Sequence, residues 1–361
     1  MTKIKLLKLF DRIIGRALLF FLHETKSITG SIPGQIKRII FIRPGGIGDA
    51  VLLLPAINIL KRAFPETEID VLCEKRNASV FELSGGMRRI YKYDKGLELF
   101  RCLRNRYDVV IDTEQWHRLS AFIAFIVGGN IRIGFDTNER RKAFTHKIPY
   151  SHDDYEIYSF FHLIKPLVSE MPTFDLKKPF ISISGEVSNT LLPLAPEHKD
   201  RVIAIFPGAT VPERRWGSDR FGQVARKMSE QGYKVVILGS RIDAKDAKEI
   251  REYAEGSIDL TGKTSLVDVA SILKMSRLLL TADSGIMHMS FALGTPTISL
   301  FGAGIEKKWT PRGERDRVIS KDIDCSPCTQ FGYTPRCKRK VKCLSSITVD
   351  EVIKAMEVIL K

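Results

Sequence analysis

Short apolar runs alternate along the chain with longer segments whose apolar positions recur at helical spacing. The apolar runs of the first half occupy residues 39–42, 68–73, 107–112 and 131–135. The same rhythm restarts after residue 200, with apolar runs at 202–206, 234–238, 278–281 and 297–301. Strands that alternate with helices predict parallel sheets covered on both faces, so the expected fold class is α/β with two doubly wound domains.

The places where this rhythm begins, stops and resumes predict the domain boundaries. We expect an N-terminal helical segment at 1–30, a Rossmann-like domain at 37–185, a second Rossmann-like domain at 200–345 and a C-terminal helix at 346–361. Pro193 and Pro196 mark the crossing between the two domains. A chain of 361 residues is long enough for two domains of ordinary size.

Residues 1–22 predict a basic amphipathic helix. Its apolar positions share one face and are Leu6, Leu7, Phe10, Ile13, Ile14, Ala17, Leu18 and Phe21. Lysines and arginines occupy the other face, and such a stripe favours attachment to an anionic membrane surface. The alternative is a helix that packs on its own domain. No apolar run of the sequence reaches the roughly 18–20 residues of a membrane span.

The chain is strongly basic, with a formal net charge of +15 from 57 Lys+Arg against 42 Asp+Glu. This balance favours an anionic partner such as a phosphorylated substrate or an acidic lipid surface. Nucleic acid is the least supported partner, because basic repeats with interleaved aromatic residues and zinc-finger spacings are absent from the sequence.

A glycine-rich turn joins the first predicted strand to the first predicted helix, in the sequence Ile-Arg-Pro-Gly-Gly-Ile-Gly-Asp at 42–49. Glycines such as Gly46 and Gly48 allow the backbone to approach a ligand closely, and a helix N-terminus attracts anions. Asp49 is an acid in this turn, and is therefore either a helix cap or a general base. The turn lacks the Gly-Lys-Ser/Thr ending of a P-loop and the full dinucleotide fingerprint.

A polar cluster follows the predicted strand at 107–112. Because ligands of doubly wound sheets bind beyond the carboxyl ends of the strands, this cluster shares an edge with Asp49. Glu114, Gln115 and Arg118 are therefore candidate contacts for a substrate.

Loops after strands of the second domain, at 207–216, 283–288 and 301–304, carry the other candidate chemistry. Their polar groups and the predicted helix start are Thr210, Arg214, Arg215, Asp283, Ser284, Gly285 and His288. Arginine forks and helix N-termini suit a pyrophosphate, so these loops predict a site for a ligand that carries one. Two alternatives stay open: Asp283 as a helix cap, and His288 as a satisfied core histidine.

The chain contains six cysteines, four of them close together near the C-terminus. Cys325, Cys328, Cys337 and Cys343 have the density of a structural metal site among basic residues. Free thiols and redox-labile pairs are equally open alternatives. No cysteine lies in the predicted ligand loops, so a catalytic role is not expected.

Three motifs resemble, in this order, glycosyltransferase family 9: the motif at 42–49, Pro-Gly-Ala-Thr with Arg-Arg-Trp at 207–216, and Asp-Ser-Gly-Ile-Met-His with Ala-Leu-Gly-Thr-Pro and Leu-Phe-Gly at 283–302. These are the ADP-heptose:lipopolysaccharide heptosyltransferases, and the resemblance runs from residue 37 to about 350. It implies a GT-B fold of two facing Rossmann-like domains, with the acceptor on the first and the nucleotide-sugar on the second. It also implies inverting, metal-independent transfer that requires no cofactor.

The resemblance also implies roles for individual residues. Asp49 matches the catalytic base, Thr210 and Arg214 match phosphate contacts, and Asp283 and His288 match an Asp-x4-His element at the donor phosphates. The family often has lysine where Arg214 stands, which keeps the charge but changes the geometry. The acidic residue that contacts the donor ribose has no clear match, although Asp243 lies nearby in the sequence.

Together these expectations predict an enzyme that moves heptose from ADP-heptose to the lipopolysaccharide inner core. The expected partners are a nucleotide-sugar donor, a phosphorylated lipid-linked glycan acceptor and an anionic inner-membrane surface, with the protein cytoplasmic and peripheral on that membrane. The alternatives are a related transferase with another donor or surface-polysaccharide acceptor, a non-catalytic GT-B binding protein, and a GT-B sugar-nucleotide epimerase.

Overall fold

The chain divides into two compact units, Met1–Phe174 and Asp175–Lys361. The computed structural model describes residues 10–28, 35–168, 170–183 and 201–361. The division falls before the expected domain end at 185, because residues 175–183 pack on the second unit. Phe180 and Ile181 donate backbone N–H bonds to the carbonyl of Ala292, at 2.9 and 3.0 Å. The expected crossing at Pro193 and Pro196 lies outside the described residues.

A six-stranded parallel sheet forms the centre of the first unit, in the order β3-β2-β1-β4-β5-β6. Its strands are β1 (Arg38–Arg43), β2 (Glu68–Cys73), β3 (Arg89–Lys92), β4 (Val109–Asp112), β5 (Ile131–Phe135) and β6 (His146–Ile148). The central strands are buried on both faces, which explains why they read as continuous apolar runs rather than as an alternation.

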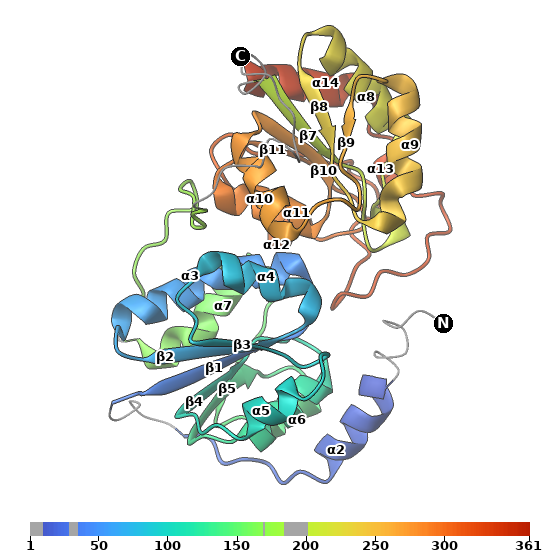
Figure 1. Cartoon of the computed structure of the whole chain (residues 1–361). Helices are drawn as coiled ribbons and strands as arrows, with labels where there is room; N and C mark the ends of the chain where they lie inside the picture. Colours follow the sequence, from blue (N-terminus) through green and yellow to red (C-terminus); the bar gives the residue numbers. More distant parts are fainter. Residues whose placement is uncertain (1–9, 29–34, 169, 184–200) are drawn as a thin grey trace. The chain divides into compact units, whose positions relative to one another are not determined.

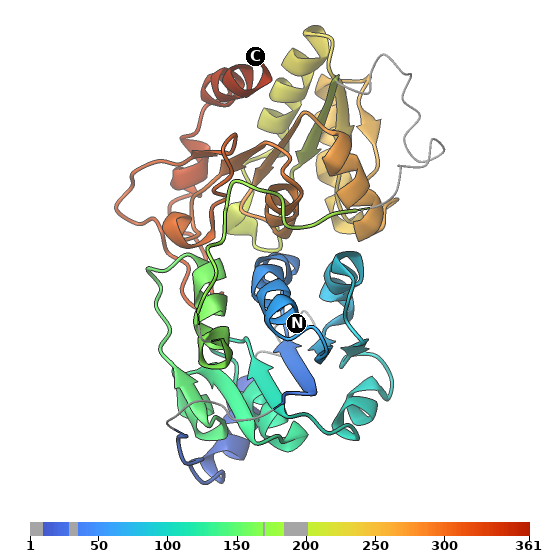
Figure 2. The ribbon, with the colours of Figure 1, turned by 90° about the vertical axis from the view of Figure 1, so that its left-hand side faces the viewer.

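Helices cover both faces of this sheet (Figure 1). One face carries α3 (Ile47–Ala63), α4 (Lys75–Ser84) and α7 (Glu156–Ile164), and Figure 2 shows α3 and α4 side by side. The other face carries α5 (Glu98–Leu103), α6 (Arg118–Val127) and the short 3-10 helix η2 (Glu139–Ala143). The strands β1, β2 and β3 extend the sheet toward one edge, whereas β4, β5 and β6 extend it from β1 toward the other edge. Because the crossovers are right-handed, this reversal of direction places α5 and α6 on the opposite face of the sheet from α3 and α4.

The N-terminal segment packs on α6, as the alternative interpretation of this segment expected. Its described part comprises the π-helical turn η1 (Asp11–Gly15) and α2 (Arg16–Phe20). Asp11, Gly15 and Leu19 recur every four residues and are buried. Asp11 Oδ1 accepts the backbone N–H groups of Arg118 and Leu119, both at 2.8 Å, and thereby caps α6 from a distant part of the chain.

The apolar stripe predicted for this helix points away from the domain. Phe10, Ile13, Ile14, Ala17 and Phe21 are exposed, so the helix packs through the narrow face that carries Asp11, Gly15 and Leu19. The predicted positions at Leu6 and Leu7 lie outside the described residues. Among the described helices, none combines the length and apolar character that a membrane crossing needs.

The second unit has its own six-stranded parallel sheet, in the order β12-β11-β10-β7-β8-β9. Its strands are β7 (Val202–Phe206), β8 (Lys234–Ile237), β9 (Ile258–Asp259), β10 (Leu278–Ala282), β11 (Thr297–Leu300) and β12 (Arg317–Ile319). The sequence pattern missed β9 and β12, because these edge strands are two and three residues long and only partly buried.

Within the described part of the second unit, the helices and short 3-10 turns are η5 (Pro212–Arg214), α8 (Ser218–Glu230), η6 (Arg241–Asp243), α9 (Ala244–Tyr253), α10 (Leu266–Met275), α11 (Gly285–Leu293), α12 (Glu306–Trp309), α13 (Lys342–Ser345) and α14 (Val349–Leu360). The final helix α14 packs beside α8 through Val352, Met356 and Ile359 (Figure 1). It therefore completes the core of the second unit.

Candidate active site

The turn between β1 and α3 has the strand–glycine–helix form that its sequence predicts. Gly45 adopts a φ of 107°, a backbone conformation that residues with a side chain rarely adopt. Gly46 is the N-cap of α3 in an extended conformation, so the capping alternative for Asp49 is wrong. Asp49 lies half-buried in the first helical turn, and a Cβ added at Gly46 would stand 3.2 Å from its Oδ2 atom.

Arg43, the last residue of β1, is buried behind this turn. Its guanidinium donates to the carbonyls of Pro44 at 2.6 Å and Thr113 at 2.7 Å, and to Glu114 Oε2 at 3.0 Å. Burial lowers the pKa of Arg43, but the nearby carboxylates, Asp49 foremost, outweigh burial and raise it overall. Arg43 is therefore a fixed cation beside Asp49.

Glu114 organises the loop after β4 from inside the domain. It is buried, and its Oε1 atom accepts the backbone N–H groups of Gln115 at 3.0 Å and Trp116 at 3.1 Å. Burial raises the pKa of Glu114, but the charges of His117, Arg43 and Arg140 and the backbone donors lower it to about 2. Both carboxylate oxygens of Glu114 thus have hydrogen-bond partners within the domain. A direct contact between Glu114 and the acceptor substrate stays a prediction.

A second buried ion pair lies beside the first. Arg140 of η2 and Asp112 at the end of β4 are both fully buried, and Arg140 Nη2 contacts Asp112 Oδ2 at 2.5 Å. Arg140 also donates to the carbonyl of Glu114. Burial raises the pKa of Asp112, and Arg140 opposes that shift without cancelling it. In the sequence Arg140 is the first of three consecutive basic residues, and nothing local shows that its side chain turns inward.

Gln115 and Arg118, the other candidate contacts of this cluster, are held by different neighbours. Gln115 Nε2 donates to Glu156 Oε1 at 2.5 Å, and Glu156 Oε2 accepts the hydroxyl of Tyr150 at 3.2 Å. Burial, then Glu156 and Asp49, raise the pKa of Tyr150, which places this phenol within electrostatic reach of Asp49. Arg118 Nε instead donates to Glu139 at 2.9 Å. Tyr150 was missed by sequence reasoning.

The ligand loops of the second unit meet at one edge of its sheet, because β7, β10 and β11 are neighbours. Arg214 Nη1 lies 3.0 Å from Asp283 Oδ2, which joins the loop after β7 to the loop after β10. The loop after β11 passes so closely that a Cβ at Gly304 would stand 2.1 Å from Asp283 Oδ2. The structure thus gathers these loops around the Arg214–Asp283 pair.

His288 lies in the first turns of α11 behind this pair. It is buried, and its Nδ1 atom has no hydrogen-bond partner among the described residues, as is also true of Arg214 Nε. His288 is therefore a buried core histidine, as the alternative interpretation expected, with one ring nitrogen unpartnered within the described part of the chain. Burial, and secondarily the charge of Arg214, lower the pKa of His288 to about 3, so the imidazole is neutral at physiological pH. Unpartnered buried nitrogens are uncommon in proteins. The charge of Arg214 acts on His288, so these two side chains lie within electrostatic reach of each other.

Ser284, and not Asp283, caps α11. The Ser284 Oγ atom accepts the backbone N–H of Met287 at 3.4 Å, and Gly285 is the first helical residue. The capping alternative for Asp283 is wrong, and its carboxylate is turned toward Arg214 instead. Thr210 is exposed in the loop after β7. A helix N-terminus, an arginine and an exposed hydroxyl on neighbouring loops form a setting in which a diphosphate can bind.

Arg215 and Asp243 hold each other within the second unit. Arg215 Nη2 donates to Asp243 Oδ1 at 2.9 Å, and Arg215 also pairs with Asp246 of α9. Asp243 is buried and accepts the backbone N–H and hydroxyl of Ser240 at 2.9 and 2.6 Å. A contact between Arg215 and the donor phosphate stays a prediction. The carboxylate of Asp243 already accepts hydrogen bonds from Arg215 and Ser240 and thereby stabilises this loop.

The cysteine-containing segment supports the ligand loops, which sequence reasoning did not anticipate. Cys328 donates its N–H to the carbonyl of Ala303 at 3.1 Å, and Cys337 donates to Glu213 Oε1 at 3.2 Å. Burial and the neighbouring cysteines raise the pKa of Cys343. All six cysteines are free thiols. Within the described ranges, no group of three or more His, Cys, Asp or Glu side chains is arranged to hold a metal ion.

Comparisons with known proteins show the family of this chain by sequence and agree on its fold by structure. The family model for glycosyltransferase family 9 (heptosyltransferase) matches residues 97–337. Lipopolysaccharide heptosyltransferase 3 of Escherichia coli K12 is 26% identical over 337 residues, which cover 87% of this chain and 95% of the relative. A solved family 9 glycosyltransferase of Veillonella parvula superposes with a TM-score of 0.73 at 22% identity, covering 92% and 99% of the two chains. An Escherichia coli heptosyltransferase solved with ADP-2-deoxy-2-fluoro heptose gives a TM-score of 0.67 at 16% identity, covering 89% and 99%.

Proposed function

Because this chain belongs to glycosyltransferase family 9, we propose that it transfers heptose from ADP-heptose to the inner core of lipopolysaccharide, with inversion at the anomeric carbon. The Arg214–Asp283–His288 cluster at the start of α11 is the observation that carries this proposal. Supporting it, the relative in Escherichia coli is a lipopolysaccharide heptosyltransferase, and a structural neighbour was solved with an ADP-heptose analogue. The transferase requires no cofactor in this proposal.

Donor binding is assigned to the second unit. Arg214, the N-terminus of α11 and the hydroxyl of Thr210 would hold the diphosphate, since a guanidinium and free helix N–H groups both match phosphate oxygens. Asp283 keeps Arg214 in place through the 3.0 Å ion pair. Neutral His288 adds a donor or acceptor without adding repulsion between cations. When the anomeric bond breaks, the electron pair leaves with ADP, and these groups stabilise the growing charge.

The chemical step is assigned to Asp49 in the first unit. Its carboxylate would take the proton of the acceptor hydroxyl as the new glycosidic bond forms on the face of the sugar opposite ADP. Arg43, buried and held by Glu114, keeps a fixed charge beside Asp49 and fixes the turn that carries it. The two units would face each other in a GT-B arrangement that brings Asp49 to the donor and excludes water.

The acceptor is proposed to be a phosphorylated, lipid-linked glycan, so the enzyme would work on the cytoplasmic surface of the inner membrane. The net charge of +15 and the exposed apolar stripe of the N-terminal helix support this setting. Basic amphipathic helices bind anionic membrane surfaces through apolar burial together with headgroup attraction.

A nucleotide titration followed by a transfer assay tests the proposed function. Calorimetry with ADP, UDP, GDP and CMP, each with and without divalent metal, should show metal-independent binding selective for ADP. Incubation with ADP-heptose and heptose-deficient lipopolysaccharide should then release ADP and extend the glycan. Selective binding of UDP or GDP would favour a related transferase with another donor. Binding of ADP without turnover would favour a non-catalytic binding protein.

A further inference from the structure

Large exposed apolar side chains are concentrated on one helical layer of the first unit. The described residues include fifteen such side chains, and ten of them lie in two places. Six belong to the segment 10–28, and four belong to α6, to α5 or to the residue just before α5. The ten residues are Phe10, Ile13, Ile14, Phe20, Phe21, Ile28, Leu97, Phe100, Phe125 and Ile126. Scattered single apolar residues are normal on protein surfaces, but such a gathering is typical of an interaction surface.

These residues lie on elements that pack side by side. The N-terminal helix caps α6 through Asp11, and α6 in turn packs beside α5 on the same face of the sheet (Figure 1). The inward sides of α5 and α6 bury Cys102, Ala121 and Ala124 in one core cluster with the strands. Their outward sides therefore form, with the exposed stripe of the N-terminal helix, a surface that we call the α2–α5–α6 face.

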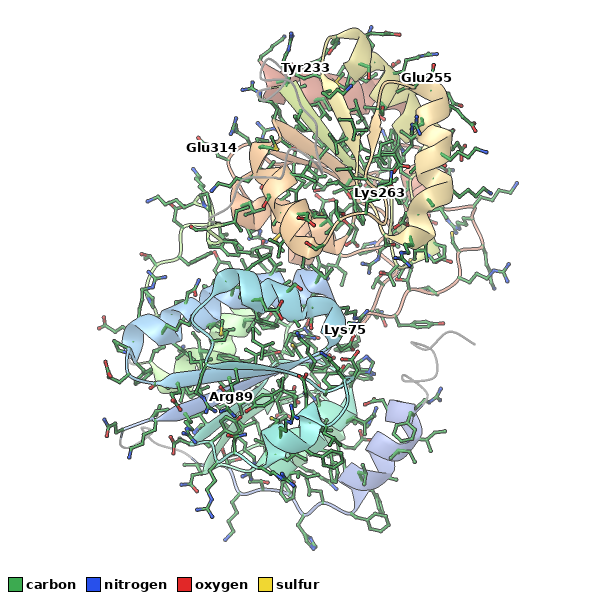
Figure 3. All side chains as sticks on the ribbon, viewed as in Figure 1. Lys75, Arg89, Tyr233, Glu255, Lys263 and Glu314 are labelled. Atoms are coloured by element: carbon green, nitrogen blue, oxygen red, sulfur yellow. The ribbon has the colours of Figure 1, made fainter. Side chains whose placement is uncertain are left out.

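The charge on this face is positive. In residues 94–108, which include α5, the four basic residues outnumber the three acids; the basic residues are Lys95, Arg101, Arg104 and Arg106, and the acids are Asp94, Glu98 and Asp108. A hollow of about 530 Å³ beside α5 is lined by three arginines and one acid, namely Arg89, Arg101, Arg104 and Glu98. Arg89, labelled in Figure 3, begins the edge strand β3. On the N-terminal helix, Arg12 and Arg16 are exposed, whereas its acid Asp11 is buried as the cap of α6.

We propose that the α2–α5–α6 face is a single docking surface for an anionic lipid bilayer, with α5 and α6 entering the interface together with the N-terminal helix. This inference rests on the membrane association proposed above and adds a second, separate anchor. Phenylalanine and isoleucine side chains would enter the region between headgroups and acyl chains, and the arginines would contact lipid phosphates. A second copy of the chain fits less well, because two such basic faces would repel each other.

Two anchors on one domain fix its orientation, which a single helix cannot do. With α5, α6 and the N-terminal helix on the bilayer, the sheet lies parallel to the membrane above one layer of helices. One layer of helices is about 10–12 Å thick, so the carboxyl edge that carries Asp49 would stand close above the headgroups. A lipid-linked glycan could then reach that edge from the side while its lipid stays in the membrane.

Vesicle sedimentation with point variants tests the second anchor. The first variant pair is Phe100→Glu with Phe125→Glu on α5 and α6, and the second is Phe20→Glu with Phe21→Glu on α2. The control pair, Val267→Glu with Val358→Glu, changes exposed apolar residues of the other unit. On phosphatidylglycerol vesicles, each of the first two pairs should lower the partition coefficient by about tenfold or more, while the control pair matches the unmodified protein.

The outcomes separate this inference from the proposals on which it rests. If the α5–α6 pair binds vesicles as the unmodified protein does, while the α2 pair does not, the second anchor is refuted and membrane association stands. If the α5–α6 pair changes the sedimentation velocity of the protein in solution without changing vesicle binding, the face contacts a second copy and the inference is refuted. ADP affinity, measured on every variant, should stay unchanged and reports separately on the donor site.

Discussion

Replacing Arg140 by methionine should destabilise the first unit strongly. Arg140 and Asp112 are both fully buried, with Nη2 and Oδ2 at 2.5 Å, and Arg140 also donates to the carbonyl of Glu114. The variant leaves the Asp112 carboxylate buried without its cation. Removing one partner of a buried ion pair costs about 3–5 kcal/mol in free energy of unfolding.

The unit Met1–Phe174 has a size for which one kcal/mol corresponds to about 2–4 °C in Tm. The expected fall in the Tm of the first unit is therefore about 10 °C. Scanning calorimetry measures it, and a saturating amount of ADP helps to assign the transitions, because ADP should shift only that of the second unit.

The neighbouring residue offers a matched control. Arg141 carries the same charge but is half-exposed, and its ion pairs with Glu24 and Asp136 are 3.4 and 3.5 Å long. Arg141→Met should change the free energy of unfolding by no more than about 0.5 kcal/mol. Adding Asp112→Asn to Arg140→Met removes the stranded charge and should recover part of the loss. Equal effects of the Arg140 and Arg141 variants would refute the reasoning.

Further predictions concern the two candidate half-sites. Asp49→Asn should lower kcat by about 10²–10⁴-fold with ADP affinity retained, as measured by ADP release and calorimetry, and unchanged turnover would remove Asp49 from the base role. Arg214→Ala should weaken ADP binding by about tenfold or more in calorimetry, and an unaltered Kd would contradict the diphosphate assignment. The pKa of His288 is lowered from 6.5 to about 3, so the unfolded chain takes up the proton first and the stability of the second unit should fall as the pH drops from 6.5 toward 3. In denaturation experiments over this pH range, His288→Gln should make the stability of the second unit depend less on pH. The control His162→Gln, which changes an exposed histidine, should leave the dependence as it is.

Much of the fold could be predicted from the sequence, because it depends on local patterns. The apolar runs at 39–42 and 202–206 identify strands buried on both faces, and the glycine turn at 42–49 identifies a strand-to-helix junction. The short edge strands β9 and β12 could not be found in this way, since strands of so few residues bury too little to leave a pattern.

The candidate site was predictable to the level of which loops meet, but not to the level of which atoms pair. Parallel strands place their carboxyl ends at one edge, so Asp283 and Arg214 were expected to be neighbours. Whether Asp283 caps α11 or pairs with Arg214 depends on side-chain geometry, and the structure assigns the cap to Ser284. The engagement of Arg215 with Asp243 and Asp246 likewise depends on contacts between distant segments.

The sequence by itself determined the α/β architecture, the repeated glycine-turn and helix-start motifs, and the family, because local hydrophobic period, turn chemistry and motif order are written along the chain. Only the tertiary structure decided that Arg43 and Arg140 turn inward, that Asp11 caps a helix more than a hundred residues away, and that the apolar stripe of the N-terminal helix joins α5 and α6 on one face. The physical reason is that burial and pairing of a charge depend on segments distant in sequence, and no local pattern records which of them meet.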